Sequence, residues 1–377
     1  MKRATNSPLM KLNNRRLVLD VIRRQPISRA DVASVTQLTR ASVTLIVEEL
    51  IEQGLLTEQR ADASGVGRRP VLLSIAEDAR CIAGVNIKRG EVNVGLVSLG
   101  GRLLSRETLS YGGSDAHDMI SRIARSLDRQ LNALPGAREK LLGVGLCAPG
   151  PLDAANGVIL NPPNCGLWRN VPAAELLSEA TGQPVYMENV SNALALEEQY
   201  FGLGRGCGSF IAVQINEGIG AGIVIRDRLY RGARGLGSEL GHISIEMDGR
   251  PCDCGNRGCL ARYASIPAIL EGSPYGSWRE LIDRLETDAE ARRLLDLEAR
   301  YLSHALVSAV NLYDVEKVIL LGDVSYRPQA LLDRLNALVG PRVIMRAAGG
   351  SPVASSETES FVRTGAIVCL HDFYQGQ

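Results

Sequence analysis

Apolar residues recur at helical spacing in the first part of the chain. Within residues 13–24 they fall on one face of a helix, at Leu17, Val18, Val21 and Ile22. Pro26 ends this helix, and Ser28 with Asp31 three positions later has the spacing of an N-terminal capping box. A second, short helix is therefore expected to run from there to about residue 35.

A third helix is expected over residues 40–53, between Thr39 as its N-cap and Gly54. Its apolar stripe has the spacing i, i+3, i+4, i+7 and consists of Val43, Ile46, Val47 and Leu50. The other side of its first turns carries Arg40, Ala41, Ser42, Thr44 and Leu45. Short helices, a tight turn and a third helix with a small polar face are typical of a helix-turn-helix, whose last helix reads base edges near its N-terminus. We predict that Arg40, Ser42 and Thr44 meet the major groove of DNA.

Two short apolar segments, residues 55–58 and 70–75, flank the sequence Gly65-Val66-Gly67-Arg68-Arg69. They predict a β-hairpin wing with a basic tip, and Arg68 and Arg69 suit the negative potential of a narrow minor groove. The alternatives are a protein-interaction module and, for the two arginines, a solvated loop. The order of three helices and a basic wing favours a winged helix-turn-helix DNA-binding domain over residues 1–76.

Residues 77–377 alternate between strand-like and helix-like segments. Strands are expected at 81–87, 91–99, 141–148, 184–188, 209–215 and 317–321, and helices at 115–134, 191–202 and within 278–311. This alternation predicts an α/β fold with ligands in the cleft between two lobes.

Composition and charge agree with a protein of two or three domains. The chain has 377 residues, and 45% of them are hydrophobic. No apolar run has membrane-spanning length and no signal-peptide core follows the basic N-terminus, so we expect no membrane partner and a cytoplasmic location. The net charge is zero, but residues 1–70 carry 12 Lys and Arg against 7 Asp and Glu, and the remainder 30 against 35. A basic head on an acidic body indicates a polyanionic partner for the head.

A histidine and three cysteines lie close together in the sequence: His242, Cys252, Cys254 and Cys259. Three thiolates and one imidazole are the donor set of a closed tetrahedral zinc site, which leaves no open position for catalysis. Gly255 and Gly258 permit the tight turns that let the sulfurs converge. We predict structural zinc in this knot, residues 242–259. The alternatives are a cluster of reduced cysteines, and a disulfide with a spare thiol.

The order of these motifs resembles the ROK family, which unites sugar kinases with sugar-responsive repressors that carry an N-terminal winged helix. The matching motifs are Gly218-Ile219-Gly220-Ala221-Gly222-Ile223, Glu239-Leu240-Gly241-His242 and the cysteine knot. The resemblance spans essentially the whole chain. It implies an actin-like, hexokinase-type fold of two α/β lobes for residues 77–377, and it implies the same four zinc ligands.

The chain departs from the kinases of that family where they hold phosphates and move a proton. Asn86-Ile87-Lys88-Arg89-Gly90 stands where the kinases have Asp-x-Gly-Gly-Thr, and Glu188-Asn189-Val190 stands where they have Glu-Asn-Asp. Valine cannot accept the proton of an attacking hydroxyl, so the general base is missing. Glu217 also adds negative charge to the second phosphate loop, and Gly322-Asp323 replaces paired glycines. We therefore expect no phosphoryl transfer.

The resemblance implies sugar contacts at Asn164, Asn189, Glu239 and His242. Amide, carboxylate and imidazole groups can each bind hydroxyls. Val190 removes a further contact, and Ala261 stands where a glutamate is usual. Such a pocket suits a smaller or differently hydroxylated sugar, or a sugar derivative. The alternative is that the two asparagines are turn residues and that Glu239 is a charge at a helix end.

These features together give one hypothesis and two rivals. The hypothesis is a transcriptional repressor of carbohydrate metabolism that binds palindromic operator DNA as a homodimer or homotetramer and responds to a sugar effector. The first rival is a ROK sugar kinase with an appended head. The second is a ligand-independent DNA-binding protein whose pocket has decayed.

Overall fold

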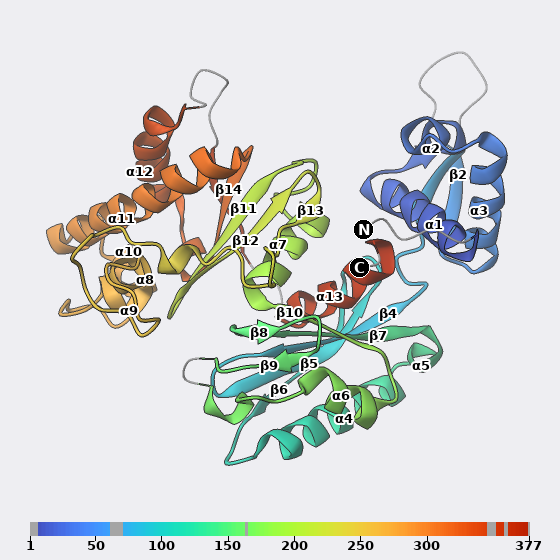
Figure 1. Ribbon diagram of the computed structural model, residues 1–377, viewed down its shortest axis with the longest axis horizontal. Helices are drawn as coiled ribbons and strands as arrows, with labels where there is room; N and C mark the ends of the chain where they lie inside the picture. The colour runs from blue at the N-terminus through green and yellow to red at the C-terminus, as the bar shows by residue number, and fades with distance from the viewer. Residues whose placement is uncertain (1–6, 61–70, 163–164, 345–351, 358–360, 376–377) are drawn as a thin grey trace. The chain divides into compact units, whose positions relative to one another are not determined.

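The computed structural model describes residues 7–60, 71–162, 165–344, 352–357 and 361–375 (Figure 1). The chain forms two compact units, Met1–Val190 with Ser360–Gln377, and Ser191–Glu359. It passes from one unit to the other twice, after Val190 and before Ser360.

The first unit begins with a small head of three helices and a three-stranded antiparallel sheet. The helices are α1 (Ser7–Arg24), α2 (Arg29–Thr36) and α3 (Arg40–Glu52). The strands β1 (Ile27–Ser28), β2 (Leu56–Arg60) and β3 (Val71–Ile75) lie in the order β1-β3-β2. The three predicted helices and the two wing strands are thus confirmed. Strand β1 was not predicted, because two residues beside a proline show no alternating pattern.

Local capping and apolar burial explain the head. Ser28 accepts the N–H of Asp31 and Thr39 accepts the N–H of Ser42, so both helices begin at the expected N-caps. The core joins all three helices to the sheet through side chains with at most 1% exposure: Val18, Ile22, Val32, Val43, Val47, Leu50 and Leu73. Burying each such side chain stabilises the fold by about 1.5–3 kcal/mol.

The remainder of the first unit is built on a five-stranded sheet of order β10-β7-β4-β5-β6. Its strands are β4 (Cys81–Ile87), β5 (Glu91–Ser98), β6 (Leu103–Ser110), β7 (Leu141–Ala148) and β10 (Val185–Asn189). The first three form an antiparallel meander, and β7 and β10 add in parallel. The other elements are α4 (Ala116–Ala133), α5 (Ala137–Lys140), β8 (Leu152–Asp153), β9 (Val158–Ile159), a 3-10 turn (Gly166–Trp168), α6 (Ala173–Thr181) and α13 (Phe361–Gln375).

Helix α13 packs on one face of this sheet although it is the last element of the chain (Figure 1). Its backbone lies directly on the strands, which is possible because Gly84 and Gly145 have no side chain. A Cβ on Gly84 would collide with the Val362 carbonyl, and one on Gly145 with the Gly365 carbonyl. The opposite face of the sheet shares an apolar core with α4 and α6. The sequence patterns predicted neither α6 nor α13.

The second unit repeats this plan. Its sheet has the order β13-β12-β11-β14-β15, again an antiparallel meander extended by parallel strands. The strands are β11 (Phe210–Ile215), β12 (Ile219–Ile225), β13 (Arg228–Leu229), β14 (Lys317–Gly322) and β15 (Val353–Ser355). The helices are α7 (Val190–Phe201), α8 (Ala261–Ala264), α9 (Ile266–Ile269), α10 (Trp278–Asp283), α11 (Ala289–Tyr313) and α12 (Gln329–Val339), with 3-10 turns at Leu240–His242, Asp323–Ser325 and Gly340–Arg342.

Both units therefore have the α/β architecture that the strand–helix alternation predicted. In the part of the chain that the structure describes, no helix combines the length and apolarity needed to cross a membrane.

Candidate functional site

Helix α3 has one buried face and one open face. Val43, Ile46, Val47 and Leu50 point into the head core, as predicted. On the other side Arg40 and Leu45 are exposed, Leu45 by 64%, and Thr44 is half-buried. The Ser42 hydroxyl shares a 2.9 Å hydrogen bond with the hydroxyl of Thr39, so Ser42 also takes part in the helix cap. An exposed cation, hydroxyls and an apolar side chain together form a surface that can contact base edges and thymine methyl groups.

The two strands of the wing pair antiparallel from Leu56 opposite Ile75 to Arg60 opposite Val71. The tip that follows Arg60 falls outside the described residues, and it includes Arg68 and Arg69. The predicted role of these two arginines stays a prediction.

The cysteine knot brings its four expected ligands together within the second unit. One donor atom from each of His242, Cys252, Cys254 and Cys259 lies within 4.8 Å of all the others. The sulfur of Cys252 is 3.6 Å from Nδ1 of His242, and the sulfurs of Cys254 and Cys259 are 3.7 Å apart. These four residues could hold a metal ion.

Two glycines shape the knot. Gly255 and Gly258 both have positive φ, 91° and 71°, which a side chain would strain. At Gly258 a Cβ would also collide with the backbone carbonyl of Glu246. The chain can therefore fold back over residues 246–258 only with glycine at this position.

Asn256 lies next to the four expected metal ligands, and the sequence patterns did not single it out. Its amide Nδ2 lies 3.4 Å from the Cys259 sulfur and donates to the backbone carbonyl of His242 at 3.2 Å. Its position between two turn glycines could have indicated a turn residue in the sequence, since asparagine is common in turns.

The thiols of the knot differ in their electrostatic surroundings. The backbone N–H of Asn256 lowers the pKa of Cys254, whereas burial raises the pKa of Cys259 to about 12. A cation among the sulfurs would favour the thiolate form of both.

The first hairpin corresponds to the segment where the kinases of the family that the sequence resembles hold phosphate. Here an ion pair between Lys88 and Glu91 lies in it. Lys88 pairs with Glu91 at 3.1 Å and lies over the ring of Phe361, 4.0 Å from its centroid. Hydrogen bonding to Lys88 lowers the pKa of Glu91. The ammonium group is therefore engaged within the first unit.

Next to this hairpin, Asn86 is 1% exposed, and neither its amide nitrogen nor its oxygen has a hydrogen-bond partner among the described residues. Glu188 is also buried, and it accepts the N–H of Asn189 at 2.9 Å. Val190 follows as the first residue of α7 and is half-buried. The carboxylate nearest in sequence to Val190 is thus enclosed rather than open to a substrate.

Two acidic loops meet at one edge of the second sheet. Strands β11 and β14 are parallel neighbours, with Ile215 opposite Gly322, so the loops that follow them lie side by side. Glu217 and Asp323 are both exposed there. Asn216 ties the loops together by accepting the N–H of Asp323 at 2.8 Å. Two carboxylates at this edge would repel the phosphates of a nucleotide.

The four expected sugar contacts are not all in one unit. Asn189 ends β10 in the first unit, whereas Glu239 precedes a 3-10 turn in the second and His242 ends that turn, and both are exposed. Asn164 lies outside the described residues. Within the second unit Gly241 passes so close to Ile219 that a Cβ would collide with the Ile219 carbonyl. This contact brings the Glu239–His242 motif against the glycine-rich strand β12.

Comparison with known proteins places this geometry in context. The model of the ROK family matches residues 82–372. The xylose repressor of Caldicellulosiruptor bescii is 29% identical over 358 residues, which cover 89% of this chain and 90% of the repressor. The glucokinase of Thermotoga maritima is 33% identical over 298 residues, which cover 92% of the glucokinase but 73% of this chain.

One solved structure is similar over almost the whole length. A ROK family transcriptional regulator, described as a homologue of the Escherichia coli MLC protein, superposes with a TM-score of 0.83 and 25% identity. The superposition covers 97% of each chain, so it includes the head as well as both α/β units.

Proposed function

Because the chain belongs to the ROK family, we propose that it is a DNA-binding transcriptional repressor of carbohydrate metabolism that responds to a sugar or sugar derivative. The observation that carries this proposal is a head of three helices and two paired wing strands with an open α3 face. It is joined to an α/β body in which Val190 stands where the resemblance to the kinases implies a proton acceptor. The similarity to a xylose repressor and to a ROK transcriptional regulator over nearly the full chain supports it.

Residues 1–76 would bind operator DNA. Arg40, Ser42 and Thr44 would meet the major groove, since they lie on the first turns of the open face of α3. Arg68 and Arg69 would occupy the minor groove beside it.

Replacing Arg68 and Arg69 by alanine should weaken operator binding and reduce the salt slope by about two, because two fewer cations neutralise phosphate or groove charge and release counterions. Fluorescence anisotropy over a series of salt concentrations measures both quantities. Arg129→Ala, at an exposed position on α4, is the control. An unchanged slope would contradict the wing assignment.

The knot would hold structural zinc. Around one zinc ion with bonds of about 2.3 Å to sulfur and about 2.05 Å to nitrogen, tetrahedral geometry separates two sulfurs by about 3.8 Å and a sulfur from the nitrogen by about 3.6 Å. The separations of 3.7 Å and 3.6 Å fit these values. Bound zinc would fix the thiolates and hold the segment that carries Glu239 and His242 in one conformation.

Phosphoryl transfer is not the activity we propose. Val190 offers no proton acceptor and Glu188 is buried. Lys88 and Arg89 stand where the kinases have two glycines that admit phosphate, and Lys88 is paired with Glu91. Glu217 and Asp323 add negative charge where the second phosphate loop would bind. Each feature acts against nucleotide binding or against the chemical step.

The sugar effector would contact Asn164, Asn189, Glu239 and His242. A bound sugar would change operator affinity only if it binds the DNA-binding form and the released form of the protein with different affinities. A homodimer or homotetramer would match the two halves of a palindromic operator.

The test is an operator search combined with a kinase assay. Fragments upstream of the protein's own gene should include one that binds at least about a thousandfold more tightly than random DNA. One sugar of a broad panel should release it. Sugar-dependent ADP formation at ordinary kinase rates, with no fragment bound, would overturn the proposal in favour of a sugar kinase. Specific binding that no sugar alters would favour the ligand-independent alternative.

A further inference from the structure

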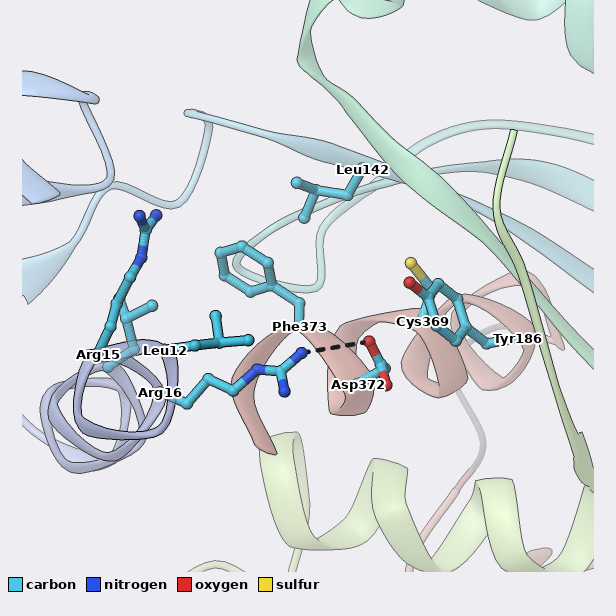
Figure 2. A pocket seen from close by; sticks show the side chains of 9 residues that line it. Leu12, Arg15, Arg16, Leu142, Tyr186, Cys369, Asp372 and Phe373 are labelled. Carbon is cyan, nitrogen blue, oxygen red and sulfur yellow. Dashed lines mark ion pairs between the residues drawn. The ribbon is translucent and has the colours of Figure 1, made fainter. Parts of the chain in front are cut away.

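A pocket of about 210 Å³ lies within the first unit, where the head meets the body (Figure 2). One wall is α1, and the other walls are the C-terminal turns of α13 and residues of β7 and β10. The pocket takes no part in the DNA, metal or sugar sites proposed above.

The floor and walls of the pocket are largely apolar. Leu12 and Leu19 come from α1, Leu142 from β7 and Phe373 from α13. Leu12 is 43% exposed and Phe373 is half-buried, so apolar surface remains open to water inside the pocket. Covering such surface with an apolar group is favourable, because it removes apolar area from water. An apolar cavity of about 150 Å³ is already large enough to bind benzene.

The rim of the pocket is cationic. Arg16 reaches from α1 toward Asp372 of α13, but their closest N–O distance is 3.7 Å, too long for a hydrogen bond (Figure 2). Arg15 donates to the side chain of Gln53. Among the described residues, Asp372 and Gln53 are the acceptors near these two guanidinium groups. Each guanidinium has five N–H donors, so most of the donors remain available. Arg16 faces Asp372, whereas Arg15 is turned toward Gln53 of the head (Figure 2). The described lining therefore has two guanidinium groups and one carboxylate, which leaves donors and positive charge to spare.

Other groups around the rim do not cancel this charge. Among the described lining residues Asp372 is the one carboxylate, and burial together with the charge of Asp372 raises the pKa of its neighbour Tyr186. Glu49 lies near Arg15, but it is paired with Lys11 at 2.6 Å, and Arg80 adds a further positive charge. Burial lowers the pKa of Arg15, which reflects incomplete solvation of its charge. An anion beside the guanidinium would oppose that shift, because an opposite charge stabilises the charged form.

We propose that this pocket binds a small aromatic monocarboxylate, with the ring against Leu12, Leu142 and Phe373 and the carboxylate on Arg15 and Arg16. The ring matches the apolar interior in size, and a carboxylate matches the planar donor fork of arginine. Because α1 belongs to the head and α13 to the body, the ligand contacts both and stabilises their junction.

The probe is benzoate, titrated by isothermal calorimetry and by thermal unfolding of the full-length protein. We expect a dissociation constant on the order of 1 mM, as is reasonable for nine non-hydrogen atoms, and a rise in melting temperature of a few degrees at saturation. Acetate, which lacks the ring, and benzyl alcohol, which lacks the charge, should each bind at least tenfold more weakly. Equal binding of benzyl alcohol would overturn the assignment of the arginines.

Variants locate the site. Arg15→Gln with Arg16→Gln should weaken benzoate binding at least tenfold, and Leu12→Trp, at a partly exposed position, should block it by filling the pocket. Arg129→Gln, an exposed arginine of the same unit, is the matched control and should bind like the wild type. No effect of benzoate at twenty times the expected constant, or an undiminished effect in the double variant, would overturn the proposal. None of these readouts uses DNA or sugar, so their outcome is independent of the proposed repressor function.

Discussion

The cysteine knot and the expected sugar site share His242, but the chain assembles them in different ways. All four knot residues come from one segment of the second unit, and turns at two glycines bring their donor atoms within 4.8 Å. The expected sugar residues come from both units, with Asn189 in the first and Glu239 and His242 in the second. The first site is complete in its local fold, whereas the residues expected at the second are far apart in the sequence. Mutations should therefore separate metal binding from effector binding.

The largest expected effect is the loss of the metal. Cys254→Ser should remove bound zinc and lower the free energy of unfolding by several kcal/mol, because a closed site with one ligand missing loses much of a binding free energy of about 10–16 kcal/mol. Metal analysis and thermal unfolding measure the two quantities. Cys207→Ser changes a half-exposed cysteine of the same unit outside the knot and should leave both unchanged. Full zinc content in Cys254→Ser would contradict the ligand set.

The next effect concerns the sugar site alone. Asn189→Ala and Glu239→Gln should each raise the sugar concentration needed to release operator DNA by about 10- to 100-fold, the range expected for one lost hydrogen bond to a charged or strongly polar group. Zinc content should stay complete. Glu246→Gln, at an exposed glutamate of the same segment, is the control. A normal sugar response in both variants would show that these positions do not bind the effector.

His242 allows the sharpest comparison, because one residue is assigned to both sites. His242→Cys should keep zinc in an all-cysteine site and keep the melting temperature near that of the wild type. It should nevertheless weaken the sugar response by about tenfold through loss of the imidazole. His242→Ala should lose both properties. If His242→Cys binds zinc and responds normally to sugar, His242 is only a metal ligand.

The smallest effect concerns the core beneath the knot. Helix α8, which follows Cys259 closely, packs on α11, and α11 carries Glu298. The Glu298 carboxyl is fully buried with no hydrogen-bond partner among the described residues, and burial raises its pKa well above 4.5. The folded protein therefore holds this proton more tightly than the unfolded chain, so wild-type stability falls as pH rises above about 4.5 toward the folded pKa.

Glu298→Leu should remove that penalty and raise the free energy of unfolding by about 1 kcal/mol or more at pH 8, with a smaller gain at pH 5. Urea unfolding at both pH values tests this. Glu290→Gln on the same helix should behave oppositely, because Arg293 lowers the pKa of Glu290 and the stabilisation it gives is present at higher pH. A pH-independent gain in Glu298→Leu would show that the carboxyl is not the cause.

Features that depend on neighbouring residues could be predicted from the sequence. The helices of the head follow from apolar spacing and from the caps Ser28 and Thr39. The convergence of the knot follows from cysteine spacing and glycine turns. Strand β1 and helices α6, α12 and α13 were not predicted. Strand β1 is too short to show a pattern and α13 is buried at most positions, so neither has a clear period, whereas α12 does bury Leu331, Leu335 and Val339 at helical spacing.

In the candidate sites, too, the sequence indicated the residue types but not their contacts. The sequence indicated Val190 in place of an acid, but it did not show that Glu188 is buried or that Lys88 is held by Glu91 and Phe361. Asn256 beside the Cys259 sulfur is a further contact that only the folded loop reveals. Side-chain contacts of this kind depend on which elements become neighbours.

The sequence by itself determined the α/β class, the helices of the head and the set of residues at the knot, because each follows from residue types at short, fixed spacing. Tertiary structure alone decided that α13 lies on the first sheet and that its last turns meet α1. Val362 comes to rest on Gly84, and Asp372 comes to face Arg16, across most of the length of the chain. Such contacts arise from close packing of the whole fold, which no local pattern encodes.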